Sequence, residues 1–513
     1  MDQLPFVHET VVHMLADAAA RAGNTVAITC DGESLSYAEL IRCAGGFAAE
    51  LQTLGARGER VALICGNSND MAVAMFAVHA AGMQEVPVNP IYTRRELQHI
   101  LEDAEPVAVV FDETAAGLVE HLAIELNIRH RIKVGGDDGR RLTEWRDDET
   151  ATLPDPFPNP DSFATLQYTG GTTGLPKGVN ITHRQLSVNL SQREAAWPTR
   201  KDQEILLCVM PLFHVFASSM CLHLAVYCRG TMIIHRRYHP EAVLDAIERG
   251  QVTLLPVGPT IYNGLMSHER FAATDFSSLY RAYSGSAPMP EETLRRWEEL
   301  TGCQILEGYG QSEAGPVLTA NFDDRPIVPG SVGLPLPETE IQIADVETGK
   351  TRLAAGEEGE VIARGPQIMS GYRNRPEETA TALRDGWLYT GDIGRLDEHG
   401  ILYITDRKKD MVIVGGYNVY PREIDEVLFA HPDVMEAAAV GVPDSYRGEV
   451  IHAFVVLKHP FDDAETMLSE YCSAELAKYK VPANFHIVDQ LMKTTVGKID
   501  KAAMRRSLAS EET

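Results

Sequence analysis

The feature that most constrains the fold is a regular alternation of strand-like and helical patterns over the first 280 residues. Apolar runs typical of strands occupy residues 60–66, 106–112, 204–210, 230–235 and 252–258, and helical patterns occupy 68–83 and 240–250. Parallel strands need long crossover connections, which are usually helices. The alternation therefore predicts an α/β fold in which helices cover parallel sheets.

Beyond about residue 330 the pattern changes to short strands punctuated by Gly and Pro, which predicts a small β-rich unit. A charged run, "DRKKD" (406–410), separates this unit from a helix that begins at Pro421, a strand at 452–458 and a helix near 463–478. We therefore expect an N-terminal domain at 1–405, a boundary segment at 406–409 and a compact α+β domain at 410–513.

Composition excludes several classes of partner. Lys and Arg total 46 against 73 Asp and Glu, and the net charge of −27 opposes nonspecific binding to nucleic acid or to an anionic membrane. Eight scattered cysteines without a C-x-x-C pair, and no signal peptide at the start, predict reduced thiols in a cytoplasmic protein. The most apolar windows, 71–83 and 210–228, are interpreted as buried helices, so no integral membrane segment is expected.

The stretch "YTGGTTGLPKG" (168–178) has the composition of an anion-binding loop. Glycines let backbone N–H groups approach a ligand, threonines add hydroxyl donors and Lys177 adds a positive charge. It differs from the P-loop, because Leu175 and Pro176 separate Gly174 from the lysine. Taken alone, the composition of the stretch favours an ordinary Gly/Thr turn, and the rest of the chain has to decide between the two interpretations.

Three further stretches follow in order: "EGYGQSEAGPVL" (307–318), "YTGDIGRLDEHGILYITDRKKDMVIVGGYNVYPREI" (389–424) and "KTTVGKIDK" (493–501). Together with the loop, they resemble the adenylate-forming superfamily of acyl-CoA synthetases, luciferases and peptide-synthetase adenylation domains. The resemblance extends from "LSYAEL" (35–40) to the C-terminal stretch and is strongest to fatty-acyl-CoA and 4-coumarate-CoA ligases.

The resemblance implies a large N-terminal domain of two helix-covered sheets plus a small β-barrel, and a small C-terminal domain that rotates between two half-reactions. ATP, Mg²⁺ and coenzyme A are the implied cofactors, and a small carboxylic acid is the implied substrate. Lys409 corresponds to the hinge position, and Gly415 and Gly416 would line the pantetheine tunnel. The sequence leaves open whether the protein forms a homodimer.

The resemblance also assigns site residues. The phosphates of ATP would be bound by the loop residues Thr169, Gly170, Gly171, Thr172, Thr173, Gly174 and Lys177, with Thr172 also a candidate catalytic group. The adenine would lie between Tyr309 and Gly285, Ser286 and Ala287, within a site that includes Glu307, Gly308 and Gly310. Ser312 would bind the α-phosphate, Asp392 and Arg407 the ribose, and Glu313 with Thr169 the Mg²⁺.

Two candidate catalytic residues remain. Lys498 corresponds to the lysine that bridges the attacking carboxylate and the α-phosphate, although a solvated lysine on a polar tail is the alternative. His214 would lie between the acyl pocket and the thiol site, and a buried core histidine is an equal alternative. Glu313 has a competing interpretation as a helix-cap residue. Met492 stands where the family usually has proline, which puts the rigidity of the lysine loop in doubt.

The acid is predicted from the residues expected around it, which are mostly apolar: Val215, Phe216, Val257, Pro259, Gly308, Pro316 and Val317. Such a pocket discriminates alkyl acids by size, so a medium- or long-chain fatty acid is favoured. Gly170 also favours a fatty acid, because the family's fatty-acid ligases share a glycine at this position. The run "EAGPVL" resembles 4-coumarate ligases and keeps an aryl acid as the second candidate. Two alternatives of a different class are an adenylation enzyme that loads a carrier protein and a luciferase-like oxygenase.

Overall fold

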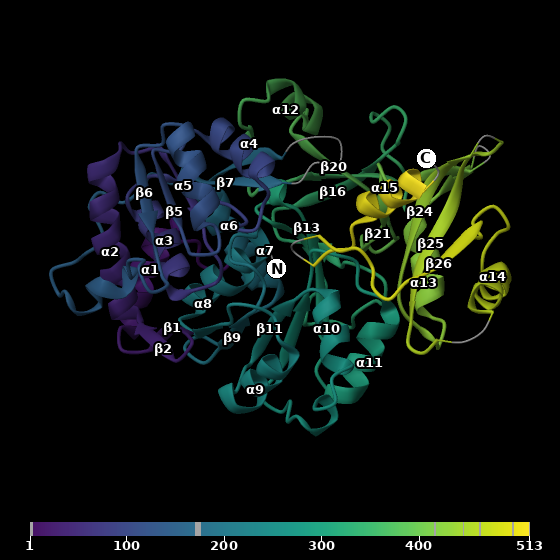
Figure 1. The fold of residues 1–513 in the computed structure, drawn as a ribbon, viewed down its shortest axis with the longest axis horizontal. Coiled ribbons are helices and arrows are strands. Elements are labelled where there is room, and N and C mark those ends of the chain that lie inside the picture. Colours follow the sequence, from purple (N-terminus) through teal and green to yellow (C-terminus); the bar gives the residue numbers. More distant parts are fainter. Residues whose placement is uncertain are drawn as a thin grey trace.

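The computed structural model describes residues 4–169, 176–414, 417–444, 446–460, 463–494 and 497–511. Four sheets organise these residues (Figure 1). Two large sheets and their helices form one side of the molecule, and the fourth sheet lies at the opposite end beside the C-terminal helix. The third sheet lies between them.

The first sheet has nine strands in the order β15-β14-β13-β12-β11-β9-β10-β1-β2. Its strands are β1 (Val26–Cys30), β2 (Glu33–Ser36), β9 (Ile205–Cys208), β10 (Thr231–Ile234), β11 (Leu254–Val257), β12 (Arg281–Ser284), β13 (Ile305–Gly310), β14 (Val317–Ala320) and β15 (Leu334–Pro335). The central strands pair in parallel, as the alternation predicts, and β14 turns back antiparallel on β13. The functional motif at 307–318 spans this turn.

The second sheet has seven strands in the order β18-β8-β7-β4-β3-β5-β6. They are β3 (Arg60–Ile64), β4 (Gln84–Pro87), β5 (Ala108–Phe111), β6 (His130–Lys133), β7 (Phe163–Thr169), β8 (Lys177–Thr182) and β18 (Gly371–Tyr372). The strands β7 and β8 are antiparallel, and the predicted anion loop connects them. Strand β18 comes from a distant part of the chain and pairs with β8.

Helices cover both large sheets, and some lie buried between layers. They are α1 (Val11–Ala22), α2 (Tyr37–Leu54), α3 (Asn69–Ala80), α4 (Arg94–Ala104), α5 (Ala116–Glu125), α6 (His183–Ala196), α7 (Val215–Ala217), α8 (Leu224–Cys228), α9 (Pro240–Gly250), α10 (Pro259–Met266) and α11 (Glu291–Thr301). Every residue of α3 is buried, as expected for a helix without a solvent face. A π-helical segment, Ser218–His223, separates α7 from α8.

The β-rich unit predicted beyond residue 330 is a five-stranded antiparallel sheet. It contains β16 (Glu340–Ala344), β17 (Gly359–Arg364), β19 (Leu383–Arg384), β20 (Trp387–Leu396) and β21 (Leu402–Arg407), with α12 (Pro376–Ala382) beside it. Register places Asp392 of β20 opposite Arg407 of β21. Two residues that lie far apart in the motif are therefore cross-strand neighbours.

The C-terminal unit has its own sheet: β22 (Val412–Val414), β23 (Tyr417–Val419), β24 (Val434–Asp444), β25 (Gly448–Leu457) and β26 (Asn484–Ile487). Three helices accompany it: α13 (Pro421–Phe429), α14 (Ala464–Glu475) and α15 (Lys501–Glu511). Its apolar side chains pack in two clusters drawn from residues 412 onwards. This unit therefore has a hydrophobic core of its own.

The eight cysteines are free and buried. Across the described ranges, no helix combines the length and apolar character that crossing a bilayer requires.

Candidate active site

The residues expected around the nucleotide converge at the end of β13 and on the third sheet. The Tyr309 hydroxyl donates a hydrogen bond to Oδ2 of Asp392 at 2.7 Å, and Arg407 Nε lies 3.4 Å from Oδ1 of the same carboxylate. Burial raises the pKa of Asp392, and the charge of Arg407 opposes that rise. The structure thus brings together three residues that sequence motifs suggested separately.

Two glycines at this site leave space that aromatic rings fill. A Cβ atom at Gly285 would lie 2.9 Å from Cε2 of Phe216, and a Cβ at Gly308 would lie 2.8 Å from Cη2 of Trp197. Both distances are shorter than real Cβ contacts, so a side chain at either position would have to displace the neighbouring ring. Trp197 is buried, and its indole N–H donates to the carbonyl of Asn321 at 2.6 Å.

The neighbouring site residues have different surroundings. Ser286 has a φ of 71°, and Ala287 follows it in the loop after β12. Gly310 ends β13, where a Cβ would lie 1.9 Å from the carbonyl oxygen of Pro316. Glu307 is buried, and burial raises the pKa of its carboxyl group to about 8.

The phosphate end of the site combines three segments of the chain. Ser312 and Glu313 form a short 3₁₀ turn after β13, and Oε1 of Glu313 accepts a hydrogen bond from the Tyr372 hydroxyl at 2.8 Å. Lys177 Nζ lies 4.6 Å from the centre of the Tyr372 ring. Thr169 and Lys177 are paired residues across the β7–β8 hairpin.

The loop between them lies outside the described residues. It contains the expected phosphate ligands Gly170, Gly171, Thr172, Thr173 and Gly174. The same is true of Gly415 and Gly416, which were expected at the pantetheine tunnel. The outer residues of the phosphate stretch are therefore described, and its centre remains a prediction.

Lys498 is held in a tight hairpin. Thr494 donates its backbone N–H to the Lys498 carbonyl at 2.7 Å, and its hydroxyl accepts the Lys498 N–H at 3.2 Å. The Asp500 N–H donates to the Met492 carbonyl at 2.8 Å, so this loop is closed by hydrogen bonds without the usual proline. A Cβ atom at Gly497, the residue before Lys498, would lie 3.8 Å from Oγ1 of Thr260 in α10, so this hairpin borders the N-terminal part of the chain.

Burial lowers the pKa of Lys498 to about 8, with Arg407 adding to that effect and Asp392 opposing it. Burial also lowers the pKa of His214 to about 3, and the charge of Lys498 contributes. Nδ1 of His214 accepts the backbone N–H of Phe216 at 3.2 Å, which leaves the proton of the neutral ring on Nε2. The neutral ring of His214 is therefore fixed at the start of α7 by this hydrogen bond.

Sequence reasoning missed Tyr372, Trp197 and Arg422. Tyr372 and Trp197 are single aromatic residues outside the quoted motifs, and no local pattern distinguishes them from core residues. Arg422 lies at the start of α13, where its Nη1 donates to the Ile404 carbonyl at 2.7 Å and its backbone N–H donates to Asp406 at 2.9 Å. It connects the C-terminal unit to the third sheet.

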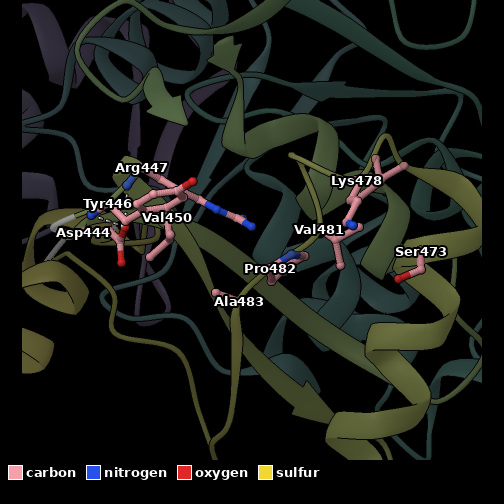
Figure 2. A pocket seen from close by; sticks show the side chains of 10 residues that line it. Asp444, Tyr446, Arg447, Val450, Ser473, Lys478, Val481, Pro482 and Ala483 are labelled. Atoms are coloured by element: carbon pink, nitrogen blue, oxygen red, sulfur yellow. Dashed lines mark hydrogen bonds between the residues drawn. The ribbon is translucent and has the colours of Figure 1, made fainter. Parts of the chain in front are cut away.

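A separate open cleft of about 760 Å³ lies on the C-terminal unit. Figure 2 shows Tyr446 and Arg447 on one side of it and Ser473 and Lys478 on the other. None of the motif residues described above lines this cleft.

Comparison with known proteins gives consistent results over nearly the whole chain. The family model described as AMP-binding enzyme matches residues 15–373, and the AMP-binding enzyme C-terminal domain matches residues 423–498. A long-chain-fatty-acid–CoA ligase of Bacillus subtilis is 38% identical over 100% of this chain and 96% of its own length. A feruloyl-CoA synthase of Amycolatopsis is 35% identical over 95% of this chain and 97% of its own.

Solved structures agree in fold. ATP-bound MatB from Rhodopseudomonas palustris superposes with a TM-score of 0.90 at 32% identity, covering 100% of both chains. The apo form of MatB covers the same lengths at the same identity with a TM-score of 0.78. On the two family models and the full-length relatives, the chain belongs to the AMP-binding enzyme family of adenylate-forming ligases.

Proposed function

We propose that this enzyme activates a medium- or long-chain fatty acid with ATP and transfers the acyl group to coenzyme A. The observation that carries this proposal is geometric: Asp392 binds the Tyr309 hydroxyl and lies beside Arg407, and the Lys498 hairpin of the C-terminal unit lies against Thr260 of the large part. A cation at that point suits a reaction between two anions. The Bacillus subtilis relative, named a long-chain-fatty-acid–CoA ligase, supports the same choice.

In the first half-reaction, a carboxylate oxygen of the acid attacks the α-phosphorus of ATP. A new O–P bond forms, the bond to the β-phosphate oxygen breaks, and pyrophosphate leaves with the electron pair. The Lys498 ammonium stabilises the negative charge on the carboxylate and the α-phosphate oxygens, and Lys177 attracts the leaving pyrophosphate. Tyr309, Asp392 and Arg407 hold the nucleoside in place.

The residues present fit a magnesium ion at the phosphate end. Glu313 is buried, and its carboxylate supplies the hard oxygen that Mg²⁺ prefers, with the Thr169 hydroxyl as a second candidate ligand. The ion would neutralise charge on the phosphates of ATP. Glu313 and Thr169 orient the phosphate end, and Lys177 adds a second positive charge there.

In the second half-reaction, the CoA sulfur attacks the acyl carbonyl carbon, AMP leaves, and the thiol proton is released. Because Nδ1 of His214 accepts a backbone N–H, the ring would act as a donor through Nε2. We place the hinge at 406–409, between domains at 1–405 and 410–513, with Lys409 as the pivot. Rotation would exchange the Lys498 hairpin for the segment at Gly415 and Gly416.

The similarity scores support assigning the present arrangement to the first half-reaction. The ATP-bound MatB structure has the higher TM-score, 0.90 against 0.78 for the apo form.

Eight free cysteines support a cytoplasmic location. The feruloyl-CoA synthase relative keeps an aryl acid as the second candidate substrate.

The decisive assay measures AMP release from ATP for octanoate, palmitate and 4-coumarate, with and without CoA, together with the thioester formed. Thioester formation with the alkyl acids at higher kcat/KM supports the proposal. A preference for 4-coumarate transfers the assignment to aryl acids. AMP release without any thioester in the presence of CoA overturns the second half-reaction.

A further inference from the structure

We propose that Tyr372 is a positioning residue that orients the metal-binding carboxylate of Glu313 through its hydroxyl and the phosphate-binding Lys177 through its ring. The inference rests on the proposed function, because it assigns Glu313 and Lys177 to magnesium and phosphate. It adds a residue that neither the motifs nor the family similarity assigns to the site.

The backbone around Tyr372 is held on several sides, so its side chain starts from a fixed point. Strand β18 pairs with β8, where Tyr372 is opposite Val179. The Tyr372 N–H donates to the Thr379 hydroxyl at 3.0 Å. The Met369 N–H donates to the Glu313 carbonyl at 2.8 Å, so the backbone also ties this segment to the turn that carries the carboxylate.

Strand register explains how the ring reaches Lys177. Lys177 lies two residues before Val179 on β8 and so projects from the same face of that strand. It is therefore a diagonal cross-strand neighbour of Tyr372, at a separation that long side chains bridge. The observed 4.6 Å between Nζ and the ring centre is within the range of a cation–π interaction.

The Tyr372 hydroxyl donates a hydrogen bond to the Glu313 carboxylate. Among the residues that the structure describes, Tyr372 is the one hydrogen-bond donor to the Glu313 side chain. An ordinary tyrosine phenol is protonated throughout the neutral range, so this hydroxyl is available as a donor. Outer residues that fix the orientation of a ligating carboxylate commonly affect metal affinity by about 10–100-fold.

One side chain thus contacts a cation and an anion that are expected to bind the same polyphosphate. The phenol hydrogen bond to Glu313 selects one rotamer of the carboxylate, and the face of the ring selects one region for the ammonium. Both groups are then in place before ATP and its metal arrive, which lowers the entropy cost of binding.

Two substitutions separate the two contacts. Tyr372→Phe keeps the ring and removes the hydroxyl, whereas Tyr372→Leu removes both. Calorimetric titration with ATP, without the acid, is performed over a range of Mg²⁺ concentrations. For Tyr372→Phe, the Mg²⁺ concentration that produces half of the total increase in ATP affinity is expected to be about tenfold higher than for wild type. The ATP affinity of this variant without Mg²⁺ is expected to stay within about twofold of wild type. The Leu variant is expected to lose a further threefold or so in Mg²⁺-free affinity.

Tyr389 offers a matched control, because its hydroxyl also donates a hydrogen bond, to the Gly349 carbonyl at 2.6 Å, and a cation, Arg384, also lies over its ring at 4.1 Å. Tyr389→Phe and Tyr389→Leu are expected to leave both ATP titrations unchanged. Thermal unfolding of all four variants shows how much each substitution affects the fold itself.

Double variants test whether Tyr372 acts through its two neighbours. In a Glu313→Gln background, Tyr372→Phe is expected to change the Mg²⁺ requirement by less than about twofold. In a Lys177→Met background, the Tyr372→Phe and Tyr372→Leu variants are expected to have the same ATP affinity without Mg²⁺. An unchanged Mg²⁺ requirement in Tyr372→Phe, or full additivity with Glu313→Gln, overturns the inference. If wild-type protein binds no ATP, the proposed function fails instead, and the two failures are distinguishable.

Discussion

The two ends of the molecule are built on different principles. In the large N-terminal part, one large core cluster extends through several layers beside a smaller cluster between the second sheet and helices α4 and α5, and α3 is buried along its whole length. The C-terminal unit packs its apolar side chains into its own clusters and contacts the third sheet through polar groups, such as Arg422 with Ile404 and Asp406. A core of this kind resists displacement, whereas a polar junction can open at small cost in free energy.

The difference matters because the polar junction carries the candidate catalytic lysine. Arg505 of α15 also bonds Asp410 at 2.7 Å, so the helix after the Lys498 hairpin is tied to the segment next to the proposed hinge. Nucleotide-contacting candidates such as Tyr309 and Asp392 belong to the large part. The proposed site is therefore complete only when the two parts are together, and each prediction below affects one part or their junction.

The largest effect is expected from Lys498→Ala. Loss of the cation should slow acyl-adenylate formation on the order of a thousandfold, while thioester formation from supplied acyl-adenylate stays within about twofold of wild type. Stopped-flow or quench measurement of each half-reaction checks this. Lys493→Ala is the matched control, because Lys493 lies on the same hairpin but pairs with Glu436 of β24. Equal loss of both half-reactions would contradict the assignment.

A substitution confined to the large part should change acid preference without changing the balance of the half-reactions. Phe216→Tyr adds a hydroxyl near Gly285, and burying it unpaired against an alkyl chain should lower kcat/KM for octanoate and palmitate by about tenfold. The loss for 4-coumarate should be smaller. An unchanged ranking of the three acids would mean that Phe216 lies outside the acyl pocket.

The pH dependence should identify the group contributed by the C-terminal unit. Since the pKa of Lys498 is lowered to about 8, its ammonium is present below that pH and is lost above it. Acyl-adenylate formation, measured by ATP–pyrophosphate exchange, should therefore fall by up to about tenfold per pH unit above pH 8. In Lys498→Arg the residual activity should show no such decline, because the guanidinium stays charged. A decline that persists in this variant would assign the titration to another group.

The smallest effect is expected at the junction. Arg422→Ala removes the hydrogen bond to Ile404 and should weaken docking of α13 by about 1 kcal/mol. Acyl-adenylate formation should then fall by roughly fivefold, with less effect on the thioester step. Arg325→Ala, which removes an exposed arginine paired with Asp324, serves as the control. A stronger loss in the thioester step would indicate that Arg422 supports the other arrangement.

Local patterns in the sequence were sufficient for much of the fold. Alternating apolar runs predicted the parallel strands β3, β5, β9, β10 and β11, because burial on both faces leaves a continuous apolar signal. The change of pattern beyond residue 330 predicted the antiparallel sheet, and Pro421 predicted the start of α13. The order of the motifs was sufficient to identify the family, which the comparisons confirm.

The tertiary structure alone determines which of these residues contact one another. Glu313 and Tyr372 are 59 residues apart, Tyr309 and Asp392 are 83 residues apart, and each pair is joined by one hydrogen bond. Strand register and the turn between β13 and β14 determine these two contacts, and neither produces a periodic pattern in the sequence. The sequence alone determined the elements and the kinds of chemical group, because propensity and burial act locally. The contacts of the site depend on long-range pairing, and so they could be recognised only in the folded chain.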